Sequence, residues 1–171
     1  QHRQSGGLIP MLLTDAVFST INSQMNAGWT IERQEINAAD GATGAPGDIT
    51  IYKDGAIFKA IEVTERPIDG SRVDSTFSTK ITLNNAAEYL FIYTNDLPRE
   101  NALERAKAYF AQGYNINFAS ITDLTIHILL SGDEAFRTAY NERMFELFNA
   151  QDVQATIKVA WNDALTEAMQ A

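Results

Sequence analysis

Cysteine is absent from the 171-residue chain, and histidine occurs only twice. The missing cysteine excludes disulfide bonds and thiolate zinc sites, and it agrees with a reducing compartment, so we expect a cytoplasmic protein. Neither His2, close to the first residue, nor His127, inside the apolar run "IHILL", suits a Ser-His-Asp constellation. No Walker or dinucleotide glycine pattern is present either. Hydrolytic triads and nucleotide-binding loops are therefore not expected.

Long apolar runs are also missing. The longest, "IHILL", is about a quarter of the roughly 20 residues that a membrane-spanning helix needs, so we expect no membrane partner. The segment "QHRQSGGLIPMLL" has too short an apolar region for a signal peptide. Because the sequence begins with Gln1 and not with Met, we expect residues 1–171 to be one domain and a fragment of a longer chain.

The formal net charge of −9 argues against non-specific electrostatic binding of nucleic acid by this chain alone. It does not exclude a metal-dependent nuclease, because the carboxylates of such an enzyme count as negative until the metal binds. With 45% hydrophobic and 20% charged residues and four prolines, the composition is that of a globular domain with a sizeable core.

The residue pattern predicts an α/β domain, with a mixed central sheet flanked by helices. Helices are predicted over 12–27, from 69 or 71 to about 83, and over 99–112, 133–150 and 152–169. Strands are predicted over 29–36, 48–52, 56–64, 88–94 and "INFASI", while 121–130 fits either a helix or a strand. The Asp-Gly pair in "KDG" suits a hairpin turn between the second and third strands.

This hairpin carries two carboxylates. Side chains alternate along a strand, so Glu62 shares a face with Ala56, Phe58, Ala60 and Thr64. An unpaired carboxylate among such neighbours is costly and needs a cation, a metal or a hydrogen-bonding partner. Counting back from the turn places Asp48 opposite residues 60 to 62. Two hard oxygen ligands with no histidine or cysteine nearby favour Mg²⁺ or Mn²⁺.

The spacing of Asp48, thirteen residues, then Glu62 at the end of the next strand resembles the core of the PD-(D/E)xK nucleases. The stretch "APGDITIY…AIEVTERPI" is most similar to the SacI-type restriction endonucleases, and the resemblance extends from about residue 12 to "IKVAWNDAL". It implies a restriction-endonuclease-like core, with Asp48 and Glu62 as metal ligands for Mg²⁺ or Mn²⁺. It also implies double-stranded DNA as partner and a homodimer, since such enzymes usually cut palindromic sites as dimers.

The sequence departs from the family at one position. Thr64 stands where the family has a catalytic lysine, which orients the attacking water and stabilises the pentavalent phosphate. Lys80 is the first substitute, because it lies at the edge of the apolar stripe Val73, Phe77 and Ile81 of the following helix. Arg66 is a second and less apt candidate, because a guanidinium cannot act as a base. Thr64 itself could position a water through its hydroxyl.

Several alternatives stay open at this point. Asp48 could simply cap a loop, with Glu62 paired to Arg66 or Lys59 at a sheet edge. Glu32 on the preceding strand could complete a metal site or be a solvated strand residue. The expected function is a metal-dependent DNA endonuclease of the type II restriction kind. The competing expectation is a catalytically impaired nuclease fold that serves DNA binding or assembly, and a weaker third is Mg²⁺-dependent chemistry on another phosphoester.

Overall fold

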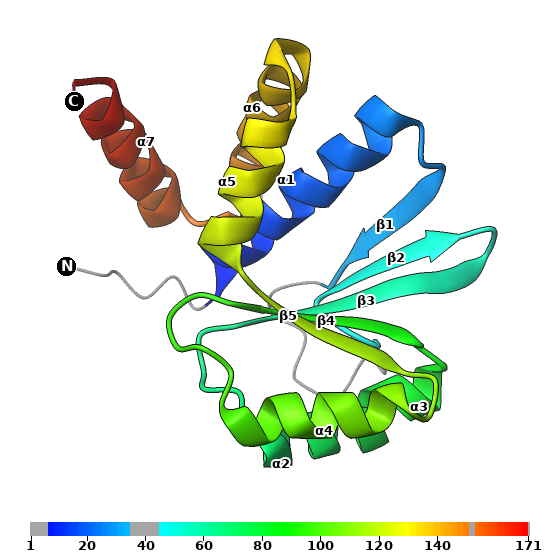
Figure 1. Ribbon diagram of the computed structural model, residues 1–171. Coiled ribbons are helices and arrows are strands. Elements are labelled where there is room, and N and C mark those ends of the chain that lie inside the picture. Colours follow the sequence, from blue (N-terminus) through cyan, green and yellow to red (C-terminus); the bar gives the residue numbers. More distant parts are fainter. Residues whose placement is uncertain (1–6, 35–44, 151–152, 171) are drawn as a thin grey trace.

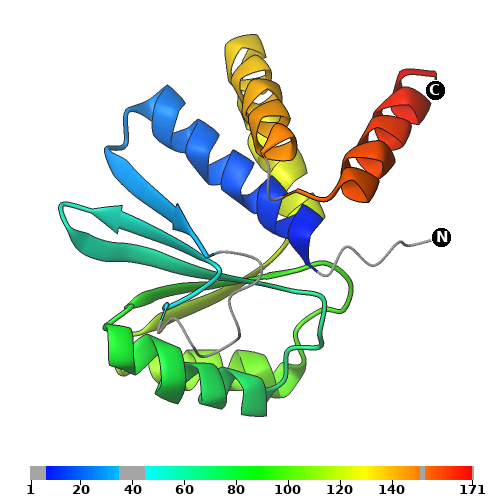
Figure 2. The ribbon, with the colours of Figure 1, turned by 180° about the vertical axis from the view of Figure 1, so that it is seen from behind.

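The computed structural model describes residues 7–34, 45–150 and 153–170, and these form a helix–sheet–helix arrangement around a five-stranded sheet (Figure 1). Helices α2 (Gly70–Thr76) and α4 (Glu100–Phe110) cover one face of the sheet. Helices α1 (Leu8–Met25), α5 (Ile121–Ser131) and α6 (Glu134–Asn149) pack on the other face, as the view from behind also shows (Figure 2). The predicted α/β class with a mixed central sheet and flanking helices is confirmed, and this fold is compatible with a restriction-endonuclease-like core.

The strands follow one another across the sheet in chain order. They are β1 (Trp29–Arg33), β2 (Ile49–Lys53), β3 (Ala56–Thr64), β4 (Glu88–Tyr93) and β5 (Asn115–Ser120). The first three pair antiparallel, whereas β3, β4 and β5 pair parallel. Parallel neighbours need a crossover, and the helices between β3 and β4 and between β4 and β5 supply it. Of the strand predicted over 29–36, residues 35 and 36 lie outside the described ranges.

Helices occupy most of the predicted places. They are α1 (Leu8–Met25), α2 (Gly70–Thr76), the π-helical turn η1 (Phe77–Ile81), α3 (Thr82–Asn84), α4 (Glu100–Phe110), α5 (Ile121–Ser131), α6 (Glu134–Asn149) and α7 (Ala155–Gln170). The first helix begins earlier than predicted, at Leu8. The ambiguous segment 121–130 is helical because the Ser120 side chain accepts a hydrogen bond from the Asp123 amide and caps α5.

Two apolar clusters lie on opposite faces of the sheet. The first joins α1, α5 and α6 to residues of the strands that include Ile49, Ile61, Leu90 and Ile92. The second joins α2 and α4 to Ala60, Tyr89, Phe91 and Ile116. Successive strand residues alternate between the clusters, as the period of two requires. Glu62, two residues after Ala60, therefore faces the α2 side.

A β-bulge interrupts this alternation near the hairpin turn. Lys59 lies opposite Ile51, but Ile57 lies opposite Tyr52, so Phe58 is the extra residue. Phe58 stacks on Trp29 with ring centroids 5.4 Å apart, whereas Ile57 packs with the α2-side cluster. The prediction that Phe58 shares a face with Glu62 is therefore wrong, because the bulge shifts the alternation by one residue.

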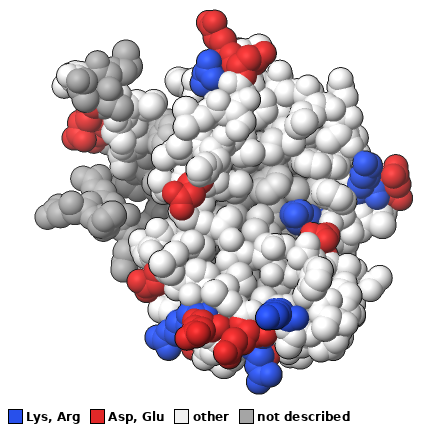
Figure 3. Space-filling view, viewed as in Figure 1, with Lys and Arg blue, Asp and Glu red and all other residues white. Residues whose placement is uncertain are grey.

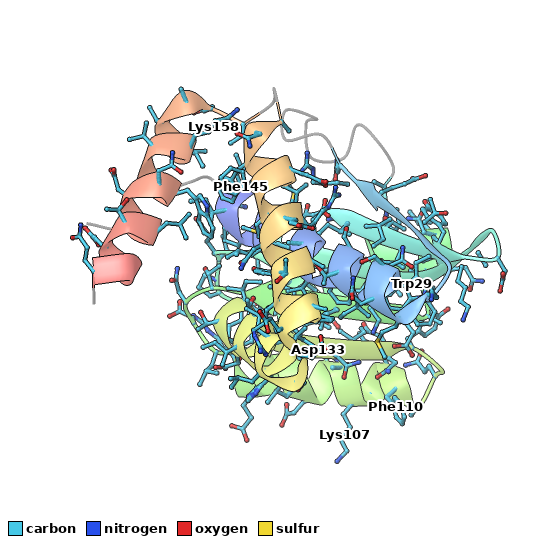
Figure 4. The ribbon with its side chains drawn as sticks, turned by 90° about the horizontal axis from the view of Figure 1, so that it is seen from above. Trp29, Lys107, Phe110, Asp133, Phe145 and Lys158 are labelled. Atoms are coloured by element: carbon cyan, nitrogen blue, oxygen red, sulfur yellow. The ribbon has the colours of Figure 1, made fainter. Side chains whose placement is uncertain are left out.

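Of the last two helices, α6 packs on α1 and α7 contacts the end of α6. Arg143 of α6 donates to the buried Asp15 carboxylate of α1 at 3.1 Å. Lys158 of α7 donates to the Ala150 carbonyl at the end of α6, at the place where the two helices approach each other (Figure 4). Within the described ranges, no helix is both long enough and apolar enough to cross a membrane.

Candidate active site

The two predicted carboxylates lie side by side at the end of the hairpin. Ile49 pairs with Ile61 across β2 and β3, so Asp48 and Glu62 are one position beyond that pair. The Val63 amide donates to Asp48 Oδ2 at 2.7 Å, and the Asp48 carbonyl accepts from the Gln34 amide at 2.8 Å. Asp48 is therefore fixed to both neighbouring strands by its own backbone and side chain. The prediction that it lies opposite residues 60 to 62 is confirmed.

Backbone packing leaves no room for a side chain directly before Asp48. A Cβ atom on Gly47 would lie 2.5 Å from the Ile61 carbonyl oxygen. Glycine thus allows the start of β2 to approach β3 closely enough for the Asp48 carboxylate to reach the Val63 amide. The small-residue sequence before Asp48 has this physical role.

Glu62 accepts hydrogen bonds from three side chains. Arg72 Nη2 donates to Oε1 at 2.7 Å, and Lys80 Nζ donates to Oε2 at 3.1 Å. The hydroxyl of Tyr89 on β4 also donates to Oε2, at 2.9 Å. The Glu62 side chain is 9% exposed, whereas Arg72 and Lys80 are 25% and 35% exposed. A buried carboxylate thus forms ion pairs with two cationic side chains that are more exposed than it is.

These partners decide the charge state of the site. Burial alone would raise the pKa of Glu62, but the charge of Lys80 and then the contacts with Arg72 outweigh it and leave this pKa below its usual value. Burial and the neighbouring carboxylates of Glu62 and Asp48 together raise the pKa of Tyr89 well above its usual value. Glu62 is therefore an anion and Tyr89 a neutral donor at neutral pH.

Lys80 reaches Glu62 from a π-helical turn. Residues Phe77–Ile81 form this turn, and the Thr82 amide donates to the Phe77 carbonyl, five residues earlier. A π-helical turn adds one residue to the helix and is often found at functional sites. Val73 and Ile81 are buried as predicted, and Lys80 lies beside them. The structure thus brings Lys80 and Glu62 together.

Thr64 and Arg66 are placed differently. Thr64 is 5% exposed, and its hydroxyl accepts from the Arg66 amide at 3.0 Å and donates to the Arg66 carbonyl at 3.5 Å. The hydroxyl therefore stabilises the turn after β3. Arg66 is exposed, and its backbone amide and carbonyl contact the Thr64 hydroxyl.

The alternative pairings of Glu62 with Arg66 or Lys59 are wrong, and Glu32 lies beside Tyr52. Glu62 pairs with Arg72 and Lys80, not with Arg66 or Lys59, and the Lys59 ammonium lies 3.7 Å from Glu88. Glu32 is exposed on β1, where its charge helps burial to raise the pKa of Tyr52. Its neighbour in the structure is thus a tyrosine of β2.

Arg72 and Tyr89 are the residues of this site that sequence reasoning missed. Arg72, Thr76 and Lys80 are spaced by four, so they form a polar stripe beside the apolar stripe of the same helix. This pattern could have identified Arg72, because a residue two turns before Lys80 lies over the same strands. Asp69 caps α2 by accepting from the Arg72 amide at 3.0 Å, which fixes the position of Arg72.

A divalent cation fits the donor types of the site. Proteins often bind Mg²⁺ through one or two carboxylates together with substrate phosphates, and Asp48 and Glu62 are two such carboxylates. Across the described part of the chain, no group of three or more acidic, histidine or cysteine residues comes together. The remaining ligands would therefore come from water and substrate.

Charges of both signs are mixed on the surface. On the face shown in Figure 3, acidic and basic residues gather together over α2 and α4, and the described residues form no broad basic patch there. Lys107 and Phe110 point away from α4 into solvent (Figure 4). Positive charge beside the Glu62 carboxylate thus comes from individual residues, Arg72 and Lys80.

Comparison with known proteins gives one family. The model of the SacI restriction endonuclease C-terminal domain matches residues 2–95, which is more than half of the chain. The match includes the hairpin with Asp48 and Glu62, the helix with Arg72 and Lys80, and β4 with Tyr89. No curated protein matches the chain. The matched segment places the chain in the family of the SacI restriction endonuclease C-terminal domain, which is a restriction-endonuclease-like family.

Proposed function

We propose that this chain is the catalytic part of a metal-dependent DNA endonuclease of the type II restriction kind. The observation that carries the proposal is the 3.1 Å contact between Lys80 Nζ and Glu62 Oε2. Through this contact Lys80, on the helix after the hairpin, would supply the cation of the PD-(D/E)xK motif. Thr64 occupies the position at which the motif itself has its lysine. The proposed substrate is double-stranded DNA, and its two-fold symmetric sites would be cut by two copies of the chain.

Asp48 and Glu62 would hold Mg²⁺ or Mn²⁺. When bound, the ion would polarise the scissile phosphate and lower the pKa of a bound water. The protein's own contribution is positional and electrostatic. The Val63 amide, which donates to Asp48 Oδ2, fixes one carboxylate, and the Tyr89 hydroxyl fixes the orientation of the other.

Lys80 would act on the developing charge. As phosphodiester hydrolysis proceeds, negative charge accumulates on the equatorial oxygens, and a fixed cation beside them lowers the barrier. Lys80 is 35% exposed, so its ammonium can contact both Glu62 and a phosphate that arrives from solvent. Thr64 supports the turn after β3 through its contacts with Arg66 and contributes no charge.

A cleavage assay on mixed-sequence DNA tests this function. Wild-type protein should cut in Mg²⁺ or Mn²⁺ and not in EDTA, and Asp48→Ala and Glu62→Gln should abolish cutting. Asp54→Ala is the matched control, because Asp54 is an exposed carboxylate at the tip of the same hairpin. Metal-dependent cutting that survives both site substitutions would refute the assignment.

A second candidate function is a nuclease-fold module that has lost catalysis and serves DNA binding or assembly. The observation in its favour is that both oxygens of Glu62 already accept hydrogen bonds from cationic side chains. Such a module would bind DNA or a partner without cutting, and Asp48→Ala would leave its binding unchanged. If cutting is absent in both metals but appears in Thr64→Lys, the fold is an intact site silenced at one residue.

A further inference from the structure

The two cations at Glu62 balance the charge of the proposed metal site. Asp48 and Glu62 carry two negative charges, and Arg72 and Lys80 carry two positive charges within the same cluster. A divalent ion added to this cluster would meet two cations and a carboxylate whose oxygens are both engaged. Repulsion from the two cations therefore disfavours binding of the ion alone, and three of the roughly four lone-pair sites of the Glu62 carboxylate already accept hydrogen bonds.

A phosphate of DNA changes this balance. It brings a negative charge to the cations, and a guanidinium binds carboxylate and phosphate in the same planar, two-pronged geometry. The Arg72 side chain is 25% exposed and the Glu62 side chain 9%, so Arg72 is the more solvent-accessible partner of this ion pair. Its backbone is fixed by the Asp69 cap, and only its side chain needs to move for the exchange.

We propose that Arg72 is a phosphate-binding residue that exchanges Glu62 for a phosphate oxygen of DNA, so that the site takes up its divalent ion only after DNA has bound. The inference rests on the proposed function, because it uses the same site and the same substrate. It adds a residue, Arg72, and an order of binding. Free protein is thereby held in a closed ion-paired state that excludes the metal.

Metal binding without turnover tests the exchange. The free Mn²⁺ signal in electron paramagnetic resonance would be followed with the full chain, without DNA and with mixed-sequence duplex DNA. A sample of Asp48→Ala with the same DNA measures the Mn²⁺ that the DNA itself binds, and this background is subtracted. Wild type should bind Mn²⁺ at least tenfold more tightly with DNA than without it. Arg72→Gln should bind Mn²⁺ without DNA at least tenfold more tightly than wild type does.

Arg105→Gln is the matched control. Arg105 also forms an ion pair with a carboxylate of α2, through Nε to Asp74 Oδ2 at 3.1 Å, but it is 56% exposed and lies apart from Glu62. This variant should bind Mn²⁺ as wild type does. If Arg72→Gln binds Mn²⁺ without DNA no more tightly than wild type, the proposal is overturned.

A second variant covers the case in which Arg72→Gln does not fold. Arg72→Lys keeps the positive charge but not the two-pronged phosphate contact, so its affinity for Mn²⁺ alone should equal that of wild type. The factor by which DNA tightens Mn²⁺ binding should be at least threefold smaller for Arg72→Lys than for wild type, and an unchanged factor would overturn the proposal. DNA cleavage without DNA-linked Mn²⁺ binding refutes this inference alone, whereas DNA-linked Mn²⁺ binding without cleavage refutes only the endonuclease function.

Discussion

Substitution of Lys80 by methionine separates a catalytic lysine from a structural one. The ammonium lies 3.1 Å from Glu62 Oε2, and two unit charges at this distance attract by about 5 kcal/mol at an effective dielectric constant of 20. Desolvation and side-chain ordering offset most of this attraction, and Lys80 is 35% exposed. Glu62 also keeps Arg72 and Tyr89 as partners. We therefore expect the free energy of unfolding to fall by about 1–2 kcal/mol.

The expected effect on the reaction is larger. Removal of one fixed group that stabilises transition-state charge typically lowers kcat by about 10²–10³-fold. Unfolding in urea, followed by tryptophan fluorescence, and cleavage of DNA in Mg²⁺ would be measured on the same preparation. A stability loss of 1–2 kcal/mol leaves nearly all molecules of an ordinary domain folded, so it cannot account for such a rate loss.

Lys59→Met is the control for this experiment. Lys59 lies on β3 and its ammonium is 3.7 Å from Glu88, away from the Glu62 cluster. The Lys59→Met substitution should lower the free energy of unfolding by at most about 1 kcal/mol and leave kcat unchanged. The reasoning about Lys80 is refuted if Lys80→Met lowers stability as expected but changes kcat by less than threefold.

Three further predictions concern stability. Tyr140 is buried, its hydroxyl has no hydrogen-bond partner among the described residues, and burial raises its pKa to about 12. Tyr140→Phe should not destabilise the protein at pH 7. From pH 10 to 12, where the unfolded tyrosine ionises first, wild type should lose about 2–3 kcal/mol relative to this variant in urea titrations; a constant difference contradicts this. Because the pKa of Glu62 is lowered in the folded state, its ion pairs stabilise the fold above the unfolded pKa and are lost as pH falls through the folded one. Glu62→Gln should make the free energy of unfolding less dependent on pH in this acidic range, and an unaltered pH profile would contradict the assigned role of the Glu62 ion pairs. Gly47→Ala should cost at least about 2 kcal/mol in thermal unfolding, since its Cβ would collide with the Ile61 carbonyl; a neutral result would show that β2 can shift.

The hairpin and its carboxylates could be predicted because they depend on local rules. An Asp-Gly turn fixes the pairing of the two strands, and alternation then places Glu62 on one face. Counting from the turn gives the register to within one residue: unbroken pairing would place Ile49 opposite Ala60, and the bulge at Phe58 shifts its partner to Ile61. The family resemblance called for a lysine, and helical spacing then indicated Lys80, because the apolar stripe of its helix has to face the sheet.

Other features depend on parts of the chain that are distant in sequence. The bulge at Phe58 is stabilised by the stacked ring of Trp29 on another strand, so no pattern within the hairpin announces it. The spacing of Arg72 with Lys80 places both on one side of their helix, but the partner of Arg72, Glu62, lies on another element, β3. Contacts between distant segments decide both of these features. Segment 121–130 differs: it has no clear period, and a local contact, the Ser120 cap, makes it a helix.

The position of the lysine is the point on which the account depends most. The cleavage rate in Mg²⁺ of Lys80→Ala would be compared with that of the double variant Lys80→Ala/Thr64→Lys, which returns a lysine to the motif position on β3. If Lys80 does the work of the motif lysine, Lys80→Ala should cut at least about 100-fold more slowly than wild type, and the double variant should regain at least tenfold of that loss. Cutting by Lys80→Ala at the wild-type rate would contradict the account.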